Sequence, residues 1–267
     1  MAMAGRASSG AAIELRGVVK DFGGVRVLNG VDLAVPRGAI TVLIGPSGAG
    51  KTVTVNHIVG LIHPTEGTVE VEGADLARLT ETELNEVRQG MAAVLQGTLP
   101  FSCGLFYSMN VYENVASPLR TRKPRWSAER VHGMTMEHLR LVGLADNVND
   151  MPDTLSSGMA KRTAIARALA LEARIVLIDD FDSGIDGVRL ALLCDLLGEI
   201  REDLDATFLV TTHDMSAARK LADHAAVIHE GRIVASGEAD EVFASDSPLV
   251  SQLIGGELSG PIQLRSP

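Results

Sequence analysis

The feature that most constrains the fold is a nearly continuous apolar run, AITVLIG at 39–45, which leads directly into a glycine-rich loop. Such a run predicts a strand of a parallel sheet that is covered on both faces. The loop, GPSGAGKT, fits the pattern G-x-x-x-x-G-K-[ST] at every position, and a helix-forming run follows it. Glycines let backbone N–H groups curl around phosphate oxygens at the start of a helix, whose dipole favours anions. We therefore predict a phosphate-binding loop made of Gly45, Pro46, Ser47, Gly48, Ala49, Gly50, Lys51 and Thr52.

Two side chains of this loop and one acid further along the chain predict a metal-bound nucleotide. Lys51 is expected to reach the β- and γ-phosphates, and Thr52 to offer its hydroxyl to Mg²⁺. Asp179 ends a second apolar run, IVLID at 175–179. An acid at the carboxyl edge of a parallel sheet reaches the Mg²⁺ shell. The alternative for Asp179 is a structural aspartate that caps a helix.

The order of strand and helix signals predicts an α/β fold. Residues 13–19 and 25–35 alternate apolar and polar residues, as half-buried strands do. From about residue 159, strands alternate with helices, which indicates βαβ units and a parallel sheet. The middle of the chain, roughly 80–155, lacks strong strand signals and is interpreted as an inserted helical subdomain.

Composition excludes some functions. The formal net charge of −10 and the pI near 5.2 argue against broad, electrostatically driven binding of nucleic acid. No apolar run approaches the ~18 residues needed to cross a bilayer. Residues 1–12 are expected to form a disordered tail, because small residues dominate there.

A second candidate anion site comes from the stretch DTLSSGMAKRTAIARALALEARIVLIDD at 153–180. A phosphate-binding loop occurs in several classes of nucleotide-hydrolysing enzyme, and a GTPase is expected to carry the guanine-reading motif N-K-x-D as well. That motif does not occur in the sequence. Ser156 and Gly158 lie where a helix is expected to begin, which gives the chain another helix N-terminus suited to an anion. This segment has no phosphate-binding loop of its own, so we expect it to face a phosphate that is held by another copy of the chain.

At this point the chain resembles an ATP-binding cassette (ABC) ATPase across nearly its whole length. LSSGM at 155–159 is similar to the family signature L-S-G-G-Q, and Ser183 to Asp186 match the loop after the second acid. The resemblance implies a P-loop NTPase fold with a RecA-like parallel-sheet core, a small antiparallel β subdomain and an inserted helical subdomain. It places the ATPase domain at 13–242, with the helical subdomain at about 97–160, and a C-terminal extension at 243–267.

The resemblance also implies site roles. Gln96 matches the glutamine that serves the metal and the attacking water, and Asp180 takes the place of the general base. His213 matches the switch histidine that contacts the γ-phosphate, and Phe22 the aromatic that stacks on adenine. Two copies, most simply a homodimer, would sandwich two MgATP. The signature residues that would complete the partner's site are Ser156, Ser157 and Gly158.

A narrower resemblance points to the ATPases of mammalian-cell-entry (Mce) and Mla lipid transporters. It rests on SGM in the signature, MNVYENVASPLR at 109–120, DATFLVTTHD at 205–214 and GELSGPI at 256–262. It implies integral-membrane permease subunits as partners, contacted through 96–110, and a peripheral location at the cytoplasmic face of the membrane. It also implies a lipid cargo.

The sequence departs from the family pattern at the catalytic acid. Where relatives read D-E-P, this chain reads Asp179-Asp180-Phe181. Aspartate is one methylene shorter than glutamate, and a displacement of about 1 Å can cost about 10²-fold in rate. Phe181 in place of proline restores a backbone N–H and is expected to loosen the turn. Ser157 in place of glycine either crowds the γ-phosphate or adds a donor. The alternative function is therefore a slow or inactive nucleotide-gated subunit that pairs with a conventional ATPase.

Overall fold

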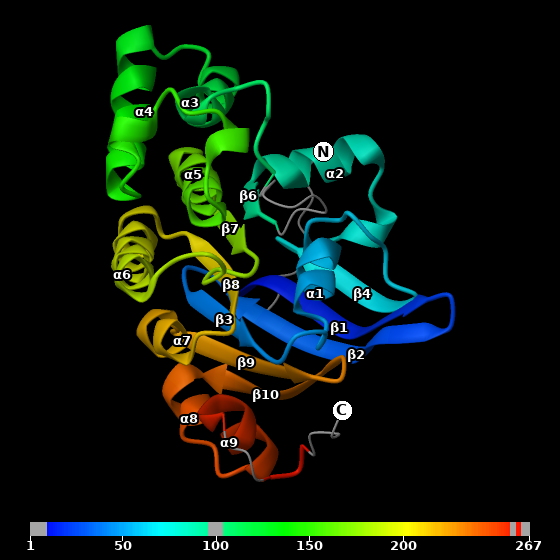
Figure 1. Cartoon of the computed structure of the whole chain (residues 1–267). Coiled ribbons are helices and arrows are strands. Elements are labelled where there is room, and N and C mark those ends of the chain that lie inside the picture. The colour runs from blue at the N-terminus through cyan, green and yellow to red at the C-terminus, as the bar shows by residue number, and fades with distance from the viewer. Residues whose placement is uncertain (1–9, 96–103, 257–259, 263–267) are drawn as a thin grey trace.

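The computed structural model describes residues 10–95, 104–256 and 260–262, and its strands form two sheets (Figure 1). The larger sheet is parallel except at one edge, where β10 runs antiparallel to β9. Its strands, in spatial order, are β10 (Arg232–Glu238), β9 (His224–His229), β3 (Ile40–Ile44), β8 (Thr207–Thr212), β7 (Ile175–Ile178) and β6 (Met91–Val94). Every residue of β3, β7 and β8 is buried, and for β3 and β7 this is what their continuous apolar runs predict.

The smaller sheet is antiparallel and lies beside β3 in the amino-terminal part of the chain (Figure 1). Its strands, in spatial order, are β2 (Val25–Pro36), β1 (Ala11–Phe22), β4 (Glu66–Val71) and β5 (Ala74–Asp75). β1 includes Ala11 and Ala12, two residues of the predicted tail. Ala11 pairs with Pro36 of β2, and the side chain of Ala12 is buried against the core, so the ordered sheet begins before the predicted boundary.

Helices cover the larger sheet and form a group to one side of it (Figure 1). The described helices are α1 (Lys51–Ile58), α2 (Glu81–Gln89), α3 (Val111–Arg122), α4 (Ala128–Leu141), α5 (Ser157–Ala170), α6 (Gly187–Leu204), α7 (Met215–Leu221), α8 (Ala239–Phe243) and α9 (Pro248–Gly255). α3, α4 and α5 pack against one another, and their apolar faces are continuous with the core under the sheet. Together the two sheets and this group of helices confirm the predicted α/β architecture.

One strand lies inside the region, roughly 80–155, for which the sequence predicts helices without strands. β6, with the sequence MAAV, forms the edge of the larger sheet and pairs in parallel with β7. Alanine has low strand propensity and four residues carry little periodicity, so the pattern gave no strand signal. Pairing with β7 and burial of Met91, Ala92 and Val94 hold the segment in the sheet.

The carboxyl-terminal helices α8 and α9 pack against β9 through a small apolar cluster, in which Val250 and Ile254 meet Ala225 and Val227. Gln252 of α9 holds Ile262 by two hydrogen bonds: its amide nitrogen donates to the Ile262 carbonyl, and its oxygen accepts from the Ile262 N–H. Among the described residues, none of the helices combines the length and apolar character that a bilayer crossing requires.

Candidate functional site: a phosphate-binding cavity

Three neighbouring parallel strands end at the same edge of the larger sheet. β8 pairs with β3 on one side and with β7 on the other, so the loops that follow the three strands are brought together. A cavity of about 470 Å³ lies between them. Of the predicted site residues, those that line it are Ser47, Gly48, Gly50, Lys51, Thr52, Asp179, Asp180 and His213.

The glycine-rich loop is folded tightly between β3 and α1. Gly48 and Gly50 have φ angles of 80° and 110°, which side chains of L-residues rarely adopt, so glycine is required at both positions. The Lys51 ammonium is buried and donates to the carbonyl of Gly45 at 2.6 Å and to that of Pro46 at 3.1 Å. Burial lowers the pKa of Lys51, and the nearby carboxylates, that of Asp179 above all, oppose the shift.

Asp179 presents an acceptor that the described protein does not satisfy. Its side chain is 1% exposed, and its Oδ1 accepts a hydrogen bond of 2.7 Å from Thr211 Oγ1. Its Oδ2 is buried and has no hydrogen-bond partner among the described residues. A buried carboxylate oxygen without a partner is costly, and Asp179 lines the same cavity as the hydroxyl-bearing Thr52. This donor set fits Mg²⁺, which prefers oxygen ligands and is held by one or two carboxylates together with substrate phosphates.

Asp180 occupies an unusual backbone conformation. Its φ is 58°, in the left-handed region, and its N–H donates to Thr211 Oγ1 at 2.8 Å. Its Oδ1 lies 4.0 Å from Nε2 of His213, so the two side chains share one wall of the cavity.

The expected loosening of the turn after Asp180 is not observed. The Phe181 N–H donates to the Thr211 carbonyl at 2.8 Å, and the Phe181 ring is fully buried in the core. The restored N–H therefore gains a partner on β8, and the ring anchors the turn.

The loop that follows is tied to the end of β8. Asp182 Oδ1 accepts hydrogen bonds from Thr212 Oγ1 at 2.5 Å and from the His213 N–H at 3.0 Å. Burial alone raises the pKa of Asp182, but these hydrogen bonds outweigh it, so the pKa lies below its ordinary 3.8. The backbone of His213 is thus held by an acid from the turn that follows the neighbouring strand β7.

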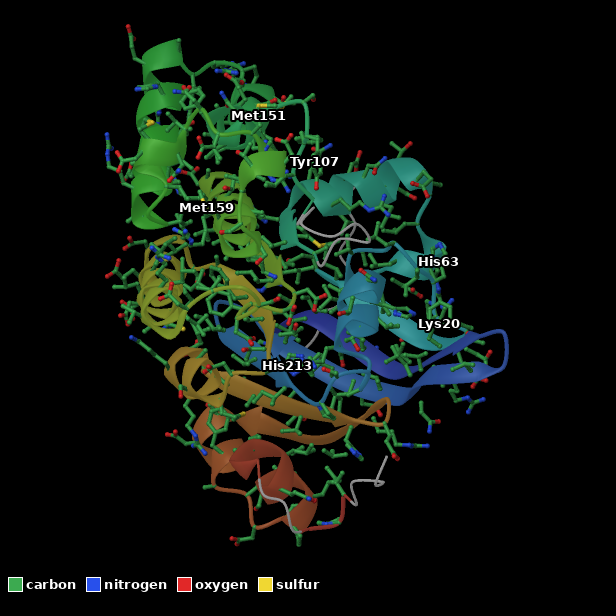
Figure 2. All side chains as sticks on the ribbon, viewed as in Figure 1. Lys20, His63, Tyr107, Met151, Met159 and His213 are labelled. Atoms are coloured by element: carbon green, nitrogen blue, oxygen red, sulfur yellow. The ribbon has the colours of Figure 1, made fainter. Side chains whose placement is uncertain are left out.

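The signature residues stand apart from the cavity of their own chain. Ser156 caps α5, its Oγ accepting from the Met159 N–H at 3.3 Å, and Ser156 and Ser157 are exposed. Neither lines the cavity, and Figure 2 shows Met159 of this helix well separated from His213. Gly158 packs against the loop after Asp180: a Cβ at this position would lie 2.1 Å from the Gly184 carbonyl oxygen, so only glycine fits.

Two other predicted residues lie outside the cavity. Phe22 is 48% exposed at the end of β1, where Lys20 Nζ stands 5.1 Å from its ring centroid, and it does not line the cavity. Gln96 lies outside the described residues. Sequence reasoning missed Thr211, which lines the cavity and bonds to both acids. The one signal for it was its place in TTHD, two residues before His213.

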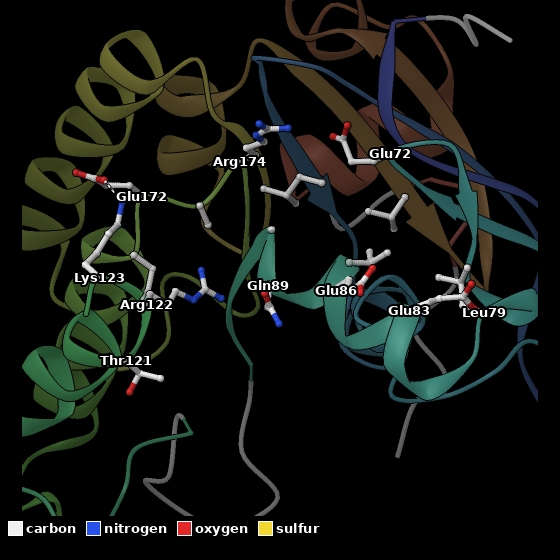
Figure 3. Close-up of a pocket in the computed structure, with 16 residues that line it drawn as sticks. Glu72, Leu79, Glu83, Glu86, Gln89, Thr121, Arg122, Lys123, Glu172 and Arg174 are labelled. Atoms are coloured by element: carbon white, nitrogen blue, oxygen red, sulfur yellow. Dashed lines mark hydrogen bonds and ion pairs between the residues drawn. The ribbon is translucent and has the colours of Figure 1, made fainter. Parts of the chain in front are cut away.

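A larger cavity of about 1010 Å³ lies at the other end of the strands, where β6 and β7 begin. Figure 3 shows Arg122 and Lys123 from the end of α3 on one side, and Glu83 and Glu86 from α2 on the other. Gly90 and Arg174, which precede β6 and β7, also line it. None of the described residues predicted to bind nucleotide lines this cavity.

Comparison with known proteins agrees with this geometry. Residues 28–183, more than half of the chain, match the family model described as ABC transporter. The chain is 39% identical over 258 residues to the probable ribonucleotide transport ATP-binding protein mkl of Mycobacterium leprae, covering 97% of this chain and 73% of that protein. It is 36% identical over 257 residues to the intermembrane phospholipid transport system ATP-binding protein MlaF of Escherichia coli K12, covering 96% and 93%.

The fold has a solved counterpart. A dimeric ATP-binding cassette in a post-hydrolysis state, bound to ADP and Pi, superposes with a TM-score of 0.77 at 29% identity, covering 85% of this chain and 98% of that one. The phosphate-binding loop, the converging strand ends and the matched family model lead to one conclusion. The chain belongs to the ABC transporter family, as an ATP-binding subunit.

Proposed function

We propose that the chain binds MgATP in the 470 Å³ cavity and hydrolyses it to drive an Mce/Mla-type lipid transporter. The observation that carries this proposal is the buried Oδ2 of Asp179, which has no hydrogen-bond partner among the described residues, on a side chain that lines the same cavity as Lys51 and Thr52. Bound Mg²⁺ supplies charge neutralisation at the phosphate oxygens. Thr52 and Asp179 would hold it, together with Gln96.

Within the site, each side chain has one proposed task. Lys51 exchanges its bonds to loop carbonyls for bonds to the phosphates, and the loop N–H groups cradle the same oxygens. Asp180 takes a proton from the attacking water or orients that water, which contributes about 10²–10⁴-fold in rate. His213, 4.0 Å from the Asp180 carboxylate, contacts the γ-phosphate. Phe22, exposed at the rim of the domain, stacks on adenine.

The working unit is proposed to be a homodimer. Ser156, Ser157 and Gly158 lie at the N-terminus of the 14-residue α5, outside the cavity of their own chain. A helix N-terminus favours an anion, so a second copy places these residues over the γ-phosphate. The dimeric arrangement of the cassette with ADP and Pi supports this pairing.

The partner is proposed to be a pair of integral-membrane permease subunits, which place the chain at the cytoplasmic face of the membrane. In the region assigned to this contact, 96–110, the structure describes 104–110, where Phe106 and Tyr107 are 51% and 44% exposed. Exposed aromatic side chains of this kind often anchor interfaces. The charged cavity beside β6 offers a second part of the docking surface, away from the nucleotide (Figure 3). The acidic net charge of −10 gives no support to a nucleic-acid partner.

The lipid cargo rests on likeness to MlaF, whose name specifies phospholipid transport, whereas the name of the mkl relative specifies ribonucleotides. An experiment that distinguishes a phospholipid cargo from a ribonucleotide cargo replaces the chain in its host with the Lys51→Ala variant. The proposal expects phospholipid distribution between membranes to change while uptake of labelled ribonucleotides stays at the wild-type level. The reverse pattern contradicts it.

Hydrolysis itself is tested by phosphate release from the purified chain with MgATP, beside Asp180→Glu and a Lys51→Ala blank. We expect wild type to release phosphate well above the blank, because the Asp180 backbone is firmly held at the cavity. If wild type matches the blank while Asp180→Glu turns over, the chain is instead a nucleotide-gated subunit that pairs with a catalytic partner.

A further inference from the structure

A buried lysine joins the signature helix to the two acids. Lys161 lies on α5, one turn after Ser157, and is 3% exposed. Its Nζ donates to the main-chain carbonyl of Asp179 at 2.5 Å. A charged donor in a dry environment makes a strong hydrogen bond, and the carbonyl has a fixed direction, so this contact constrains the backbone of Asp179.

The peptide that Lys161 binds is the one that links Asp179 to Asp180. Its carbonyl accepts from Lys161, and its N–H donates to Thr211 Oγ1 at 2.8 Å. The two bonds engage opposite ends of one planar group, one from α5 and one from β8. Immediately after it, the Phe181 N–H donates to the Thr211 carbonyl.

The two hydrogen bonds to the Asp179–Asp180 peptide hold Asp180 in an uncommon backbone conformation. Its φ of 58° is uncommon for a residue other than glycine and persists where the surroundings fix it. The direction of the peptide before Asp180 decides where its short carboxylate stands, because the side chain has only one methylene with which to adapt. Rotation of that peptide moves both the metal-facing oxygen of Asp179 and the carboxylate of Asp180.

We propose that Lys161 is a positioning residue. It fixes the Asp179–Asp180 peptide so that the Asp179 carboxylate is placed to bind the metal and the Asp180 carboxylate to act on the attacking water. This inference rests on the proposed function, since it concerns the metal ligand and the base of the same reaction. It would explain how aspartate serves where the ABC ATPase pattern has glutamate: hydrogen bonds from α5 and β8 fix the backbone, and the backbone sets how far the short carboxylate reaches.

Arg162 offers a matched control. It follows Lys161 on the same helix, is 6% exposed, and its guanidinium donates to the carbonyls of Val142 and Gly143 after the end of α4. Arg162→Met and Lys161→Met each remove a buried basic side chain of α5 that donates to main-chain carbonyls of a neighbouring loop. Only Lys161→Met releases the peptide between the acids.

The experiment compares wild type, Lys161→Met, Arg162→Met, Asp180→Asn and Lys161→Met/Asp180→Asn. It records kcat and KM for MgATP, the affinity for a fluorescent ATP analogue with and without Mg²⁺, and the thermal midpoint. We expect Lys161→Met to lower kcat about 10- to 100-fold, as a displacement of about 1 Å does, and to leave metal-free binding unchanged. In Lys161→Met, adding Mg²⁺ should raise the affinity for the ATP analogue by a smaller factor, the Mg²⁺ gain, than it does in wild type. Arg162→Met lowers the thermal midpoint but keeps kcat and the Mg²⁺ gain near wild type.

Coupling to the base is measured in the double variant. If Lys161 acts partly through the carboxylate of Asp180, Lys161→Met lowers the rate of Asp180→Asn by a smaller factor than it lowers the wild-type rate, because only its effect through Asp179 is left. The inference is overturned if Lys161→Met and Arg162→Met reduce kcat and the Mg²⁺ gain alike, or if Lys161→Met reduces the residual rate of Asp180→Asn by its full factor. If wild type does not exceed Lys51→Ala, the proposed hydrolysis fails, and the Mg²⁺-dependent gain in affinity then decides the inference alone.

Discussion

Thr211→Val removes a hydroxyl that holds both acids. Thr211 is fully buried, its Oγ1 donates to Asp179 Oδ1 at 2.7 Å, and the same oxygen accepts from the Asp180 N–H at 2.8 Å. Valine keeps the shape of the side chain but leaves two polar groups without this partner. The half-buried N–H loses about 1 kcal/mol and the buried carboxylate about 2–3 kcal/mol, so we expect a loss of about 3–4 kcal/mol in the free energy of unfolding.

The assay is urea unfolding followed by circular dichroism, with midpoints compared at equal slope. Thr211→Ser is the control, because it keeps the hydroxyl and loses one methyl group, which costs about 1 kcal/mol. The reasoning is refuted if Thr211→Val and Thr211→Ser unfold within 1 kcal/mol of each other, since the hydroxyl would then contribute little.

Two further substitutions probe the same loop. Phe181→Ala, at a fully buried ring, should lower the free energy of unfolding by about 3–5 kcal/mol, and a loss below 1 kcal/mol in urea unfolding would show that the ring does not anchor the turn. Asp182→Asn should flatten the acid limb of the stability curve. The pKa of Asp182 is lowered in the folded chain, because hydrogen bonds from Thr212 and His213 outweigh burial, so its contribution is present above the ordinary 3.8 and is lost as pH falls through the folded value. The difference between the thermal midpoints of wild type and variant should therefore shrink as pH falls below 3.8, and parallel curves would contradict the assignment.

Elements whose pattern lies within one continuous stretch of the chain could be predicted from the sequence. The run before Gly45 and the glycine-rich loop predicted a buried strand, a tight turn and a helix, and these are present as β3, the loop and α1. Asp179 likewise followed from its place at the end of an apolar run, because parallel strands of one sheet end at a common edge.

Features that depend on contacts between distant residues were not visible. Thr211 meets the acids from a strand more than thirty residues away, and Lys161 reaches Asp179 from a helix, so neither role leaves a local pattern. The left-handed conformation of Asp180 is a tertiary effect, since aspartate has no strong local preference for it. β6 was missed because pairing with β7, rather than propensity, makes it a strand.

The central claim, that two copies complete each other's ATP sites, is tested most directly by mixing two inactive variants. Lys51→Ala lacks the lysine proposed to bind the phosphates, and Ser156→Arg blocks the exposed cap of α5. In a mixed dimer, one site combines the intact Lys51 of one chain with the intact Ser156 of the other. We predict that phosphate release from the mixture rises above that of either variant alone. If the mixture stays at the level of the separate variants while both still bind each other, the ATP site is not shared between chains and the account fails.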